Sequence, residues 1–478
     1  MRPVNHNNVP QYHVAILGGG FTGTVLAAQL LRQSGGALSV IVVDQGPSRG
    51  RGIAYGTQYG WHLLNVPAKN MSAFPADPDH FLRWAQTNYD CAAEPGSYLP
   101  RRIYGQYVES VLAEANTSDS NLEWKHDQAI GLTQCGDLIA VHLRSGQTVL
   151  AEKVVLAVGN FPPSDPLLPG KARKSSRYVA FAWSADALEG ITQDTNILLV
   201  GSGLTAVDQV VALRASGFRG TIHFLSRRGL LPQRHVKTTP WPAFWNHDSP
   251  RTARGLLRLV RQQINLAQTQ GSDWRAVIDA LRPVTQKIWK LLPTIEKRRF
   301  LRHVRPYWDV HRHRVAPEIG SLLAYQLMNK NIQIHAGRVV DYRETDSAVD
   351  IVYHDRASGN EVHVCVDRVI NCAGPETDCR KFDSPLLRNL REQGWIRPDE
   401  LYLGLDTDDD GALIDAQSRA SNSLYTVGPT RKGRLWETTA VPEIRDQVAA
   451  LAERLLDTLQ LGLEDSAECG AGAIGRGL

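Results

Sequence analysis

One local pattern occurs twice in this chain, about 180 residues apart: a short apolar run, a glycine-rich turn and a helical stretch. The first copy starts with the apolar run at residues 13–17, and the second starts at residues 196–200. In both copies another apolar run follows the helical stretch, at residues 38–43 and 221–226. Strand, glycine turn, helix and strand in this order indicate a βαβ unit with parallel strands. We therefore predict an α/β fold with two Rossmann-like domains.

The first glycine turn has the spacing GxGxxG, formed by Gly18, Gly20 and Gly23, with Thr22 inside it. In such a turn the first glycine permits the tight bend, the second lets the backbone approach a pyrophosphate, and the third allows close helix packing. The N–H groups at the start of the helix then face the phosphates. Asp44 ends the following strand, where a carboxylate accepts hydrogen bonds from a ribose. These five residues predict a dinucleotide-binding site.

The second turn, VGSGLTAVD, has the related spacing GxGxxA, formed by Gly201, Gly203 and Ala206. Alanine is tolerated at the third position because only close packing is needed there. The next strand ends in Arg227 and Arg228 rather than in an acidic residue. Arginine pairs with a 2′-phosphate, which Asp or Glu would repel. The pattern favours NADPH over NADH, although paired arginines at a strand end are also typical of a solvated edge.

The C-terminal segment favours FAD at the first turn. Residues 424–433, LYTVGPTRKG, form a strand that ends near Gly428, and a helix begins close to Pro442. This segment resembles the closing FAD-binding segment of flavoenzymes with two dinucleotide sites, where the start of that helix lies near the flavin ring. With FAD at one turn and a nicotinamide at the other, one cofactor can pass hydride to the other. We predict a redox flavoprotein with FAD and NADPH (or NADH) as cofactors.

Composition argues against several other classes of protein. The 53 basic and 49 acidic residues form no long runs of one sign, so no nucleic-acid partner is predicted. The six cysteines include no Cys-x-x-Cys pair and no His/Cys cluster at metal spacing, which predicts neither a dithiol reductase nor a metal site. No stretch approaches the roughly 18 apolar residues of a membrane span. We expect a cytoplasmic protein with reduced thiols and no membrane partner. A homodimer is compatible with the sequence.

The hydrophobic patterns of the remaining segments suggest how the domains are arranged. Residues 122–158 alternate like a small strand meander, and residues 251–330 have helical periodicity. The predicted domains are an FAD-binding part at 1–165, an NAD(P)H-binding part at 166–380 with a helical insertion at about 235–330, and a C-terminal FAD-binding part at 381–478. This is the glutathione-reductase-like arrangement of two Rossmann-like domains.

Several motifs resemble those of a known family. The strand, glycine and proline order in VVLAVGNFPPSDPLLPG, which contains Gly159, is similar to the linker between the FAD and NADPH domains of flavin-containing, Baeyer–Villiger and N-hydroxylating monooxygenases. VDRVINCAGPETD looks like the matching return linker. Further segments, among them YGTQYGWHLLNVPAKNMSAF, DVHRHRVAPEIG and WETTAVPEIRDQV, resemble bacterial FAD/NAD(P)-binding proteins related to these monooxygenases. The likeness extends over nearly the whole chain.

This resemblance implies roles for residues that spacing alone does not single out. It places Asn65 and Val66 beside the flavin, and Trp436, Glu437 and Thr439 on the other side of it. The predicted catalytic and substrate-contacting residues are Asn65, Lys69, Trp436 and Glu437, and Gly159 and Gly428 join the cofactor-binding set. His62 is a further candidate for substrate contact, and His313 for acid–base work. The alternative is that these residues only pack within the FAD-binding part.

The leading hypothesis is a monooxygenase that uses NADPH and O2 to oxygenate the nitrogen of a small amine or hydroxylamine through a C4a-peroxyflavin. Trp183 stands where a His helps to define the Baeyer–Villiger signature, which argues against ketone oxygenation. The first alternative is an NAD(P)H-dependent flavin reductase that passes electrons to a quinone or partner protein. The second is a non-enzymatic redox sensor that holds FAD.

Overall fold

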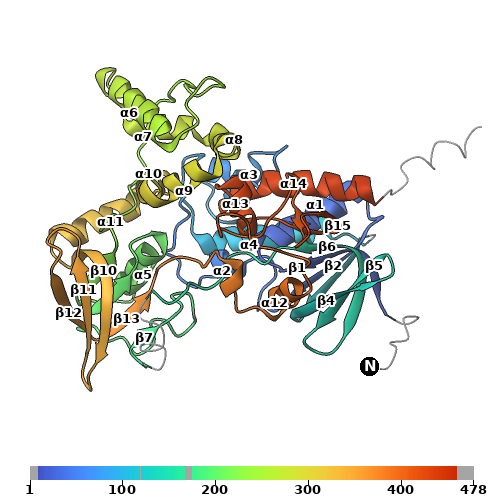
Figure 1. Ribbon diagram of the computed structural model, residues 1–478, viewed down its shortest axis with the longest axis horizontal. Helices are drawn as coiled ribbons and strands as arrows, with labels where there is room; N and C mark the ends of the chain where they lie inside the picture. The colour runs from blue at the N-terminus through green and yellow to red at the C-terminus, as the bar shows by residue number, and fades with distance from the viewer. Residues whose placement is uncertain (1–8, 119, 167–174, 460–478) are drawn as a thin grey trace, which may run out of the picture.

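Two β-sheets with helices around them form the main body of the protein (Figure 1). The computed structural model describes residues 9–118, 120–166 and 175–459. Both outer ends of the predicted FAD-binding parts, and Cys469, lie outside the described residues. Within the described part, no helix combines the length and apolar character needed to cross a membrane.

The first sheet has eight strands, and its central strands carry the first glycine turn. Its main path runs β14-β15-β6-β1-β2-β3, and β4 and β5 form a hairpin joined to β6. The strands are β1 (Gln11–Leu17), β2 (Ser39–Asp44), β3 (Asn121–His126), β4 (Ala129–Cys135), β5 (Leu138–Leu143), β6 (Thr148–Leu156), β14 (Ala412–Ile414) and β15 (Ala420–Thr426). Because β15, β6, β1, β2 and β3 are parallel, their carboxyl ends meet at one edge of the sheet.

The second sheet has seven strands in the order β12-β11-β10-β9-β8-β13-β7. The strands are β7 (Tyr178–Val179), β8 (Ile197–Val200), β9 (Ile222–Ser226), β10 (Ile332–Glu344), β11 (Val349–Asp355), β12 (Glu361–Val366) and β13 (Arg368–Asn371). The strands from β10 to β7 are parallel, whereas β11 and β12 extend the sheet as an antiparallel pair. The predicted α/β fold with two parallel-sheet units is therefore confirmed.

Helices cover both sheets with apolar side chains. On the first sheet α1 (Phe21–Ser34), α4 (Arg101–Ala115) and α14 (Val441–Thr458) share one core, which includes Val25, Val108 and Val448. α12 (Pro385–Glu392) packs in a separate core with the β4–β5 hairpin. On the second sheet α5 (Leu204–Ala215) and α11 (Pro317–Met328) cover one face. Apolar side chains of the strands, among them those of β10, β11 and β12, form a core on the other face.

A group of helices leaves the second sheet between β9 and β10, and part of it stands out from the body (Figure 1). It consists of α6 (Ala253–Thr269), α7 (Trp274–Ala280), η3 (Arg282–Val284), α8 (Thr285–Leu291), α9 (Thr294–His303) and α10 (Arg305–Arg312). Its inner end packs against the C-terminal segment, where Trp289 and Leu292 share a core with Leu403 and Trp436. Burying each such side chain contributes roughly 1.5–3 kcal/mol. We call this group the helical insertion.

One strand differs from the expectation, and a second lies away from its neighbour in sequence. The predicted meander at 122–158 is only partly a meander, because β3 pairs in parallel with β2 and extends the first sheet. β13 lies between β8 and β7, although in sequence it follows directly after β12. Strand periodicity reports which residues face a core, but neither the partner nor the direction of pairing, so these placements could not be derived from it.

Candidate functional site

The two glycine turns have almost the same backbone geometry. Gly18 has φ +114° and Gly201 has φ +112°. A Cβ on Gly18 would lie 2.4 Å from the carbonyl oxygen of Ala157, and one on Gly201 would lie 2.3 Å from that of Cys372. Both positions therefore require glycine for conformation and for space. Because each turn follows a strand and opens a helix, both have the form of a dinucleotide-binding turn.

The helices that follow these turns begin without a side-chain cap. Gly20 precedes α1 and Gly203 precedes α5, and neither helix start receives a side-chain hydrogen bond from its N-cap residue. A Cβ on Gly203 would meet no atom within 4 Å, and one on Gly20 would come only within 3.7 Å of Gly52. Uncapped N–H groups beside open backbone suit a pyrophosphate. Gly23 and Ala206 lie on the packed sides of their helices, since a Cβ on Gly23 would lie 1.9 Å from the Gly18 oxygen and Ala206 is fully buried.

Asp44 holds the first turn in place. Its Oδ1 accepts a hydrogen bond from the Gly19 N–H at 3.0 Å, and its Oδ2 accepts one from the Gly46 N–H at 3.0 Å. The next loop folds over the turn, because the Gly50 N–H donates to the Gly19 oxygen at 2.9 Å. A carboxylate offers about four lone-pair positions, so Asp44 retains acceptor capacity for a ribose.

The two arginines after β9 have different surroundings. Arg227 is exposed, whereas the partly buried Arg228 donates to the Tyr307 hydroxyl at 3.3 Å and lies 5.2 Å from the centre of that ring. Behind them, the Ser202 hydroxyl donates to Ser226 at 2.8 Å and ties the second glycine turn to the end of β9. Arg227 is therefore the freer of the two guanidinium groups for a ligand phosphate.

The segment at 62–70 lies between the two sheets. The Asn65 carbonyl oxygen accepts a hydrogen bond from His235 Nε2 at 3.1 Å, and Val66 is buried in the core of the first sheet. Lys69 is exposed, and its backbone N–H donates to Pro95. The structure thus brings Asn65 next to the segment that enters the helical insertion, while Lys69 stays at the surface.

Gly428 lies against the first glycine turn, where Thr22 is buried. A Cβ on Gly428, which has φ +86°, would come within 3.2 Å of the Thr22 hydroxyl. The Gly428 N–H donates to the Gln447 side chain at 3.1 Å, and its oxygen accepts from Thr438 at 2.7 Å. Gly428 therefore lies between Thr22 on α1 and the start of α14, and its hydrogen bonds to Thr438 and Gln447 are on the α14 side. Thr439 is exposed beside the start of α14, and Gly159 follows β6 with φ +67° and open space around it.

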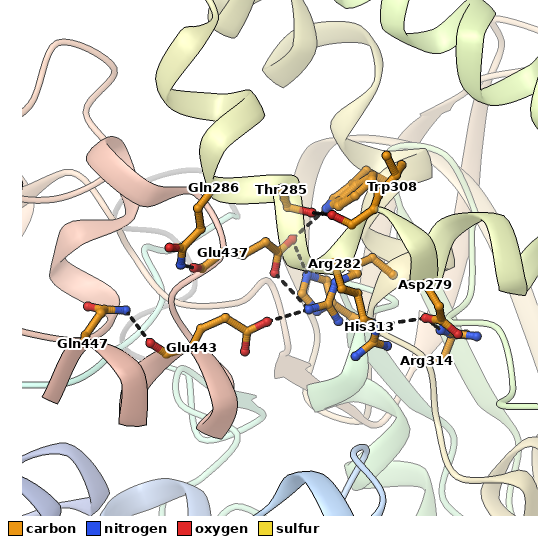
Figure 2. Close-up of polar contacts among 12 residues, drawn as sticks. Asp279, Arg282, Thr285, Gln286, Trp308, His313, Arg314, Glu437, Glu443 and Gln447 are labelled. Carbon is orange, nitrogen blue, oxygen red and sulfur yellow. Dashed lines mark hydrogen bonds and ion pairs between the residues drawn. The ribbon is translucent and has the colours of Figure 1, made fainter. Parts of the chain in front are cut away.

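Trp436 and Glu437 connect the C-terminal segment with the helical insertion. Trp436 is buried at φ +65°, and its ring stacks on Trp289 with the centroids 4.9 Å apart. Figure 2 shows Glu437 pointing toward the insertion, where its Oε1 accepts a hydrogen bond from Trp308 Nε1 at 2.7 Å. Its carboxylate also lies 3.9 Å from Arg312 Nη2 and 3.7 Å from His313 Nε2. These contacts join both side chains to the helical insertion, while the buried Trp436 Nε1 has no hydrogen-bond partner within the described part of the chain.

The neighbours of Glu437 stabilise the negative charge of its carboxylate. Burial by itself raises the pKa of this carboxyl, but the charges of His313 and Arg312 and the Trp308 hydrogen bond outweigh it and hold the pKa below its usual range. Arg312 is only 4% exposed, and it also pairs with Glu443 at 2.7 Å. Glu437 is thus an ionised, positioned group rather than a proton donor at neutral pH.

A second buried ion pair, which sequence reasoning missed, joins the two sheets. Arg101 on α4 donates to both carboxylate oxygens of Asp208 on α5, at 2.8 and 3.2 Å. His62 donates from Nε2 to the Asp208 carbonyl oxygen at 3.0 Å, so its ring serves this junction and not a free substrate contact. The one signal in the sequence is a carboxylate on the otherwise apolar side of a helix, LTAVDQVVAL. Without the partner 107 residues away, that signal does not reveal an interdomain contact.

The described part of the chain offers few groups for metal or thiol chemistry. It contains no group of three or more His, Cys, Asp or Glu residues placed to hold a metal ion. Of its five cysteines, Cys372 and Cys379 are buried. Burial raises the pKa of Cys372 well above its usual value, and raises that of Cys379 to about 11. Thiols of this kind are poor nucleophiles.

Comparison with known proteins agrees with the geometry of the first turn. Residues 15–161 match the family model described as FAD-NAD(P)-binding, so this part of the chain is an FAD/NAD(P)-binding domain. The match covers the last residues of β1, the first glycine turn and Asp44, and it confirms the predicted FAD and nicotinamide cofactors and the family resemblance there. No curated protein matches the chain by sequence.

Solved structures share the fold over almost the whole chain. L-lysine 6-monooxygenase from Pseudomonas syringae is 15% identical, with a TM-score of 0.66 over 94% of this chain and 99% of that one. The desferrioxamine-pathway cadaverine monooxygenase from Erwinia amylovora, solved with FAD, is 14% identical, with a TM-score of 0.65 over 98% and 99%. Thioredoxin reductase from Lactococcus lactis is 12% identical, with a TM-score of 0.53 over 94% and 99%. The two-unit fold of flavin- and nicotinamide-dependent enzymes is therefore the fold of this chain.

Proposed function

We propose that this chain is a monooxygenase that uses NADPH and O2 to oxygenate the nitrogen of a small amine or hydroxylamine. Residues 1–165 and 381–478 would hold FAD, and residues 166–380 would hold NADPH. The observation that carries the proposal is the pair of near-identical glycine turns, at Gly18 and Gly201, each opening an uncapped helix. When bound, FAD would accept hydride from the nicotinamide and activate O2.

The chain's own residues would bind and orient the two cofactors and enclose the site. Gly20 and Gly203 leave backbone room for the two pyrophosphates. Arg227 is placed to pair with a 2′-phosphate. The Arg101–Asp208 pair fixes the orientation of one turn relative to the other, as hydride transfer requires. Oxygen transfer to a nitrogen lone pair needs a closed, dry site more than a strong general base.

Three observations support nitrogen oxygenation over disulfide reduction. The monooxygenases with which this chain shares its fold are named for lysine and cadaverine, which are both amines. Thioredoxin reductase shares the fold less closely. The buried cysteines of this chain have raised pKa values, which makes them unfit for thiol–disulfide exchange.

The test is oxygen-isotope labelling with the FAD-loaded protein. Candidate amines and hydroxylamines are incubated with NADPH under labelled O2, and the products are analysed by mass spectrometry. The proposal predicts amine-dependent NADPH consumption and one labelled oxygen in the product. Unlabelled product, or NADPH oxidation that needs a dye or quinone as acceptor, would favour the reductase alternative instead.

A further inference from the structure

The positive charge of this chain is concentrated in the helical insertion. Residues 253–312 contain 13 Lys or Arg and four Asp or Glu, whereas the whole chain has 53 and 49. The rest of the chain therefore has more acidic than basic residues. Figure 1 shows α6 and α7 at the outer end of the insertion, away from both sheets. A surface of one sign that projects from the body is accessible to a large partner of the opposite charge.

The helix α6 presents a row of arginines to solvent. Arg254, Arg258 and Arg261 are exposed, and spacings of four and three residues place them on one face of the helix. The sequence of α6 contains no acidic residue, and within the described part of the chain none of the three arginines forms an ion pair. The same holds for the exposed Arg251, just before the helix. Four cations thus lie together without a counter-ion from the protein.

Apolar side chains lie partly uncovered beside this row. α6 packs against α7 and α9, but of its 17 residues only two, both alanines, are buried. Leu257 and Ile264 are neighbours of Arg261 on the helix surface, four residues before it and three after it, and both are partly exposed. Leu266 is 45% exposed, and the partly exposed Trp241 donates a hydrogen bond to α6 at 3.0 Å. The outer surface of α6 therefore combines cations with apolar and aromatic groups.

We infer that α6 binds the surface of an anionic phospholipid bilayer. Four basic residues on an amphipathic helix are enough for such binding, because guanidinium groups pair with lipid phosphates. Leu257 and Ile264 then enter the boundary between headgroups and acyl chains. Nucleic acid also carries phosphates, but its backbone offers these apolar side chains no comparable environment. The observations therefore favour lipid over nucleic acid.

This binding requires no membrane-spanning segment. The expectation of no membrane partner came from the lack of a stretch of roughly 18 apolar residues, which a helix lying on the bilayer surface does not need. The inference is also independent of the proposed function, since neither glycine turn takes part in it. Lipid binding can therefore be tested without turnover.

The test is flotation of the FAD-loaded protein with lipid vesicles. Vesicles of phosphatidylcholine alone are compared with vesicles in which about a quarter of the lipid is phosphatidylglycerol, at about 0.1 M and about 1 M NaCl. We expect the protein to float only with the phosphatidylglycerol vesicles and only at the lower salt concentration, because salt screens exposed charges. Equal binding to both kinds of vesicle, or no binding to the anionic ones, overturns the inference.

Variants assign the binding to α6. The combined change Arg254→Gln, Arg258→Gln and Arg261→Gln should weaken binding to the anionic vesicles at least tenfold. The control removes the same charge by changing to Gln three exposed arginines outside the insertion, Arg144, Arg219 and Arg356. The control should bind the vesicles as wild type does, and both variants should keep the unfolding midpoint and flavin content of wild type. Retained binding in the α6 variant, or an equal loss in the control, contradicts the inference.

A short DNA duplex of random sequence separates lipid from nucleic acid. The duplex is titrated into the protein at the lower salt concentration, and its binding is followed by fluorescence anisotropy. We expect half-saturation to need more duplex phosphate than phosphate of accessible phosphatidylglycerol. The opposite order overturns the inference in favour of a nucleic-acid partner.

Discussion

Gly203 differs from the other glycines of the two turns in having empty space around it. Its φ of −84° suits any residue, and a Cβ there would meet no atom within 4 Å. The protein itself therefore does not require glycine at this position, but a pyrophosphate on the helix start would. We expect Gly203→Ala to fold with its stability changed by about 0.5 kcal/mol or less. We also expect it to bind NADPH at least tenfold more weakly, measured by flavin reduction at varied NADPH concentration.

The matched control is Gly201→Ala, in which the protein supplies the clash. A Cβ there would lie 2.3 Å from the Cys372 carbonyl oxygen, at a φ that alanine rarely adopts. This variant should lose stability as well as nucleotide binding, whereas FAD binding at the first turn should persist in Gly203→Ala. Unchanged NADPH affinity in Gly203→Ala would show that no pyrophosphate lies at the second turn.

At the scale of elements, Glu437 joins the C-terminal segment to the helical insertion. It is 5% exposed and is held by Trp308, Arg312 and His313. Removing its charge leaves buried positive groups with less compensation, so Glu437→Gln should lower the free energy of unfolding by about 3 kcal/mol. Urea unfolding of the FAD-loaded protein measures this loss. Asp383→Asn, at a 99% exposed carboxylate, is the control and should change stability by about 0.5 kcal/mol or less. Equal stability of the two variants would contradict the account.

The helices and strands differ in how well they could be predicted from the sequence. β1, α1 and β2 could be predicted because three signals within 34 residues indicate the same βαβ unit. These signals are the hydrophobic periodicity, the spacing of the glycines and the carboxylate at the end of the second strand. The helices of the helical insertion show in the sequence as helical periodicity, since they are amphipathic. The contact of the helical insertion with Trp436 could not be predicted from the sequence. Trp289 and Trp436 lie far apart in the chain, and periodicity shows only that each of them is apolar.

For the molecule as a whole, two partly buried histidines predict acid sensitivity. Burial, together with nearby positive charge, lowers the pKa of His223 and of His235 from 6.5 to about 4. Between pH 6.5 and pH 4 the unfolded chain therefore binds more protons than the folded one at these sites. By linkage, their contribution to stability is full above pH 6.5 and is lost as the pH falls toward 4.

The corresponding experiment follows the free energy of unfolding against pH. The His223→Gln/His235→Gln variant should lose less stability than wild type over this range, by about 1–2 kcal/mol for each site after allowance for solvent screening. Glutamine at 235 retains a donor for the Asn65 oxygen, which limits other effects. Parallel stability curves for the variant and wild type would refute the assignment.

The central claim is that the two glycine turns bring FAD and a nicotinamide into contact within one chain. The most direct measurement is anaerobic mixing of the FAD-loaded protein with NADPH or NADH in a stopped-flow spectrometer, followed at the flavin absorbance. The account predicts that NADPH bleaches the bound flavin, and does so faster than NADH at equal concentration. A protein that takes up no FAD, or a bound flavin that neither nucleotide bleaches, would contradict it.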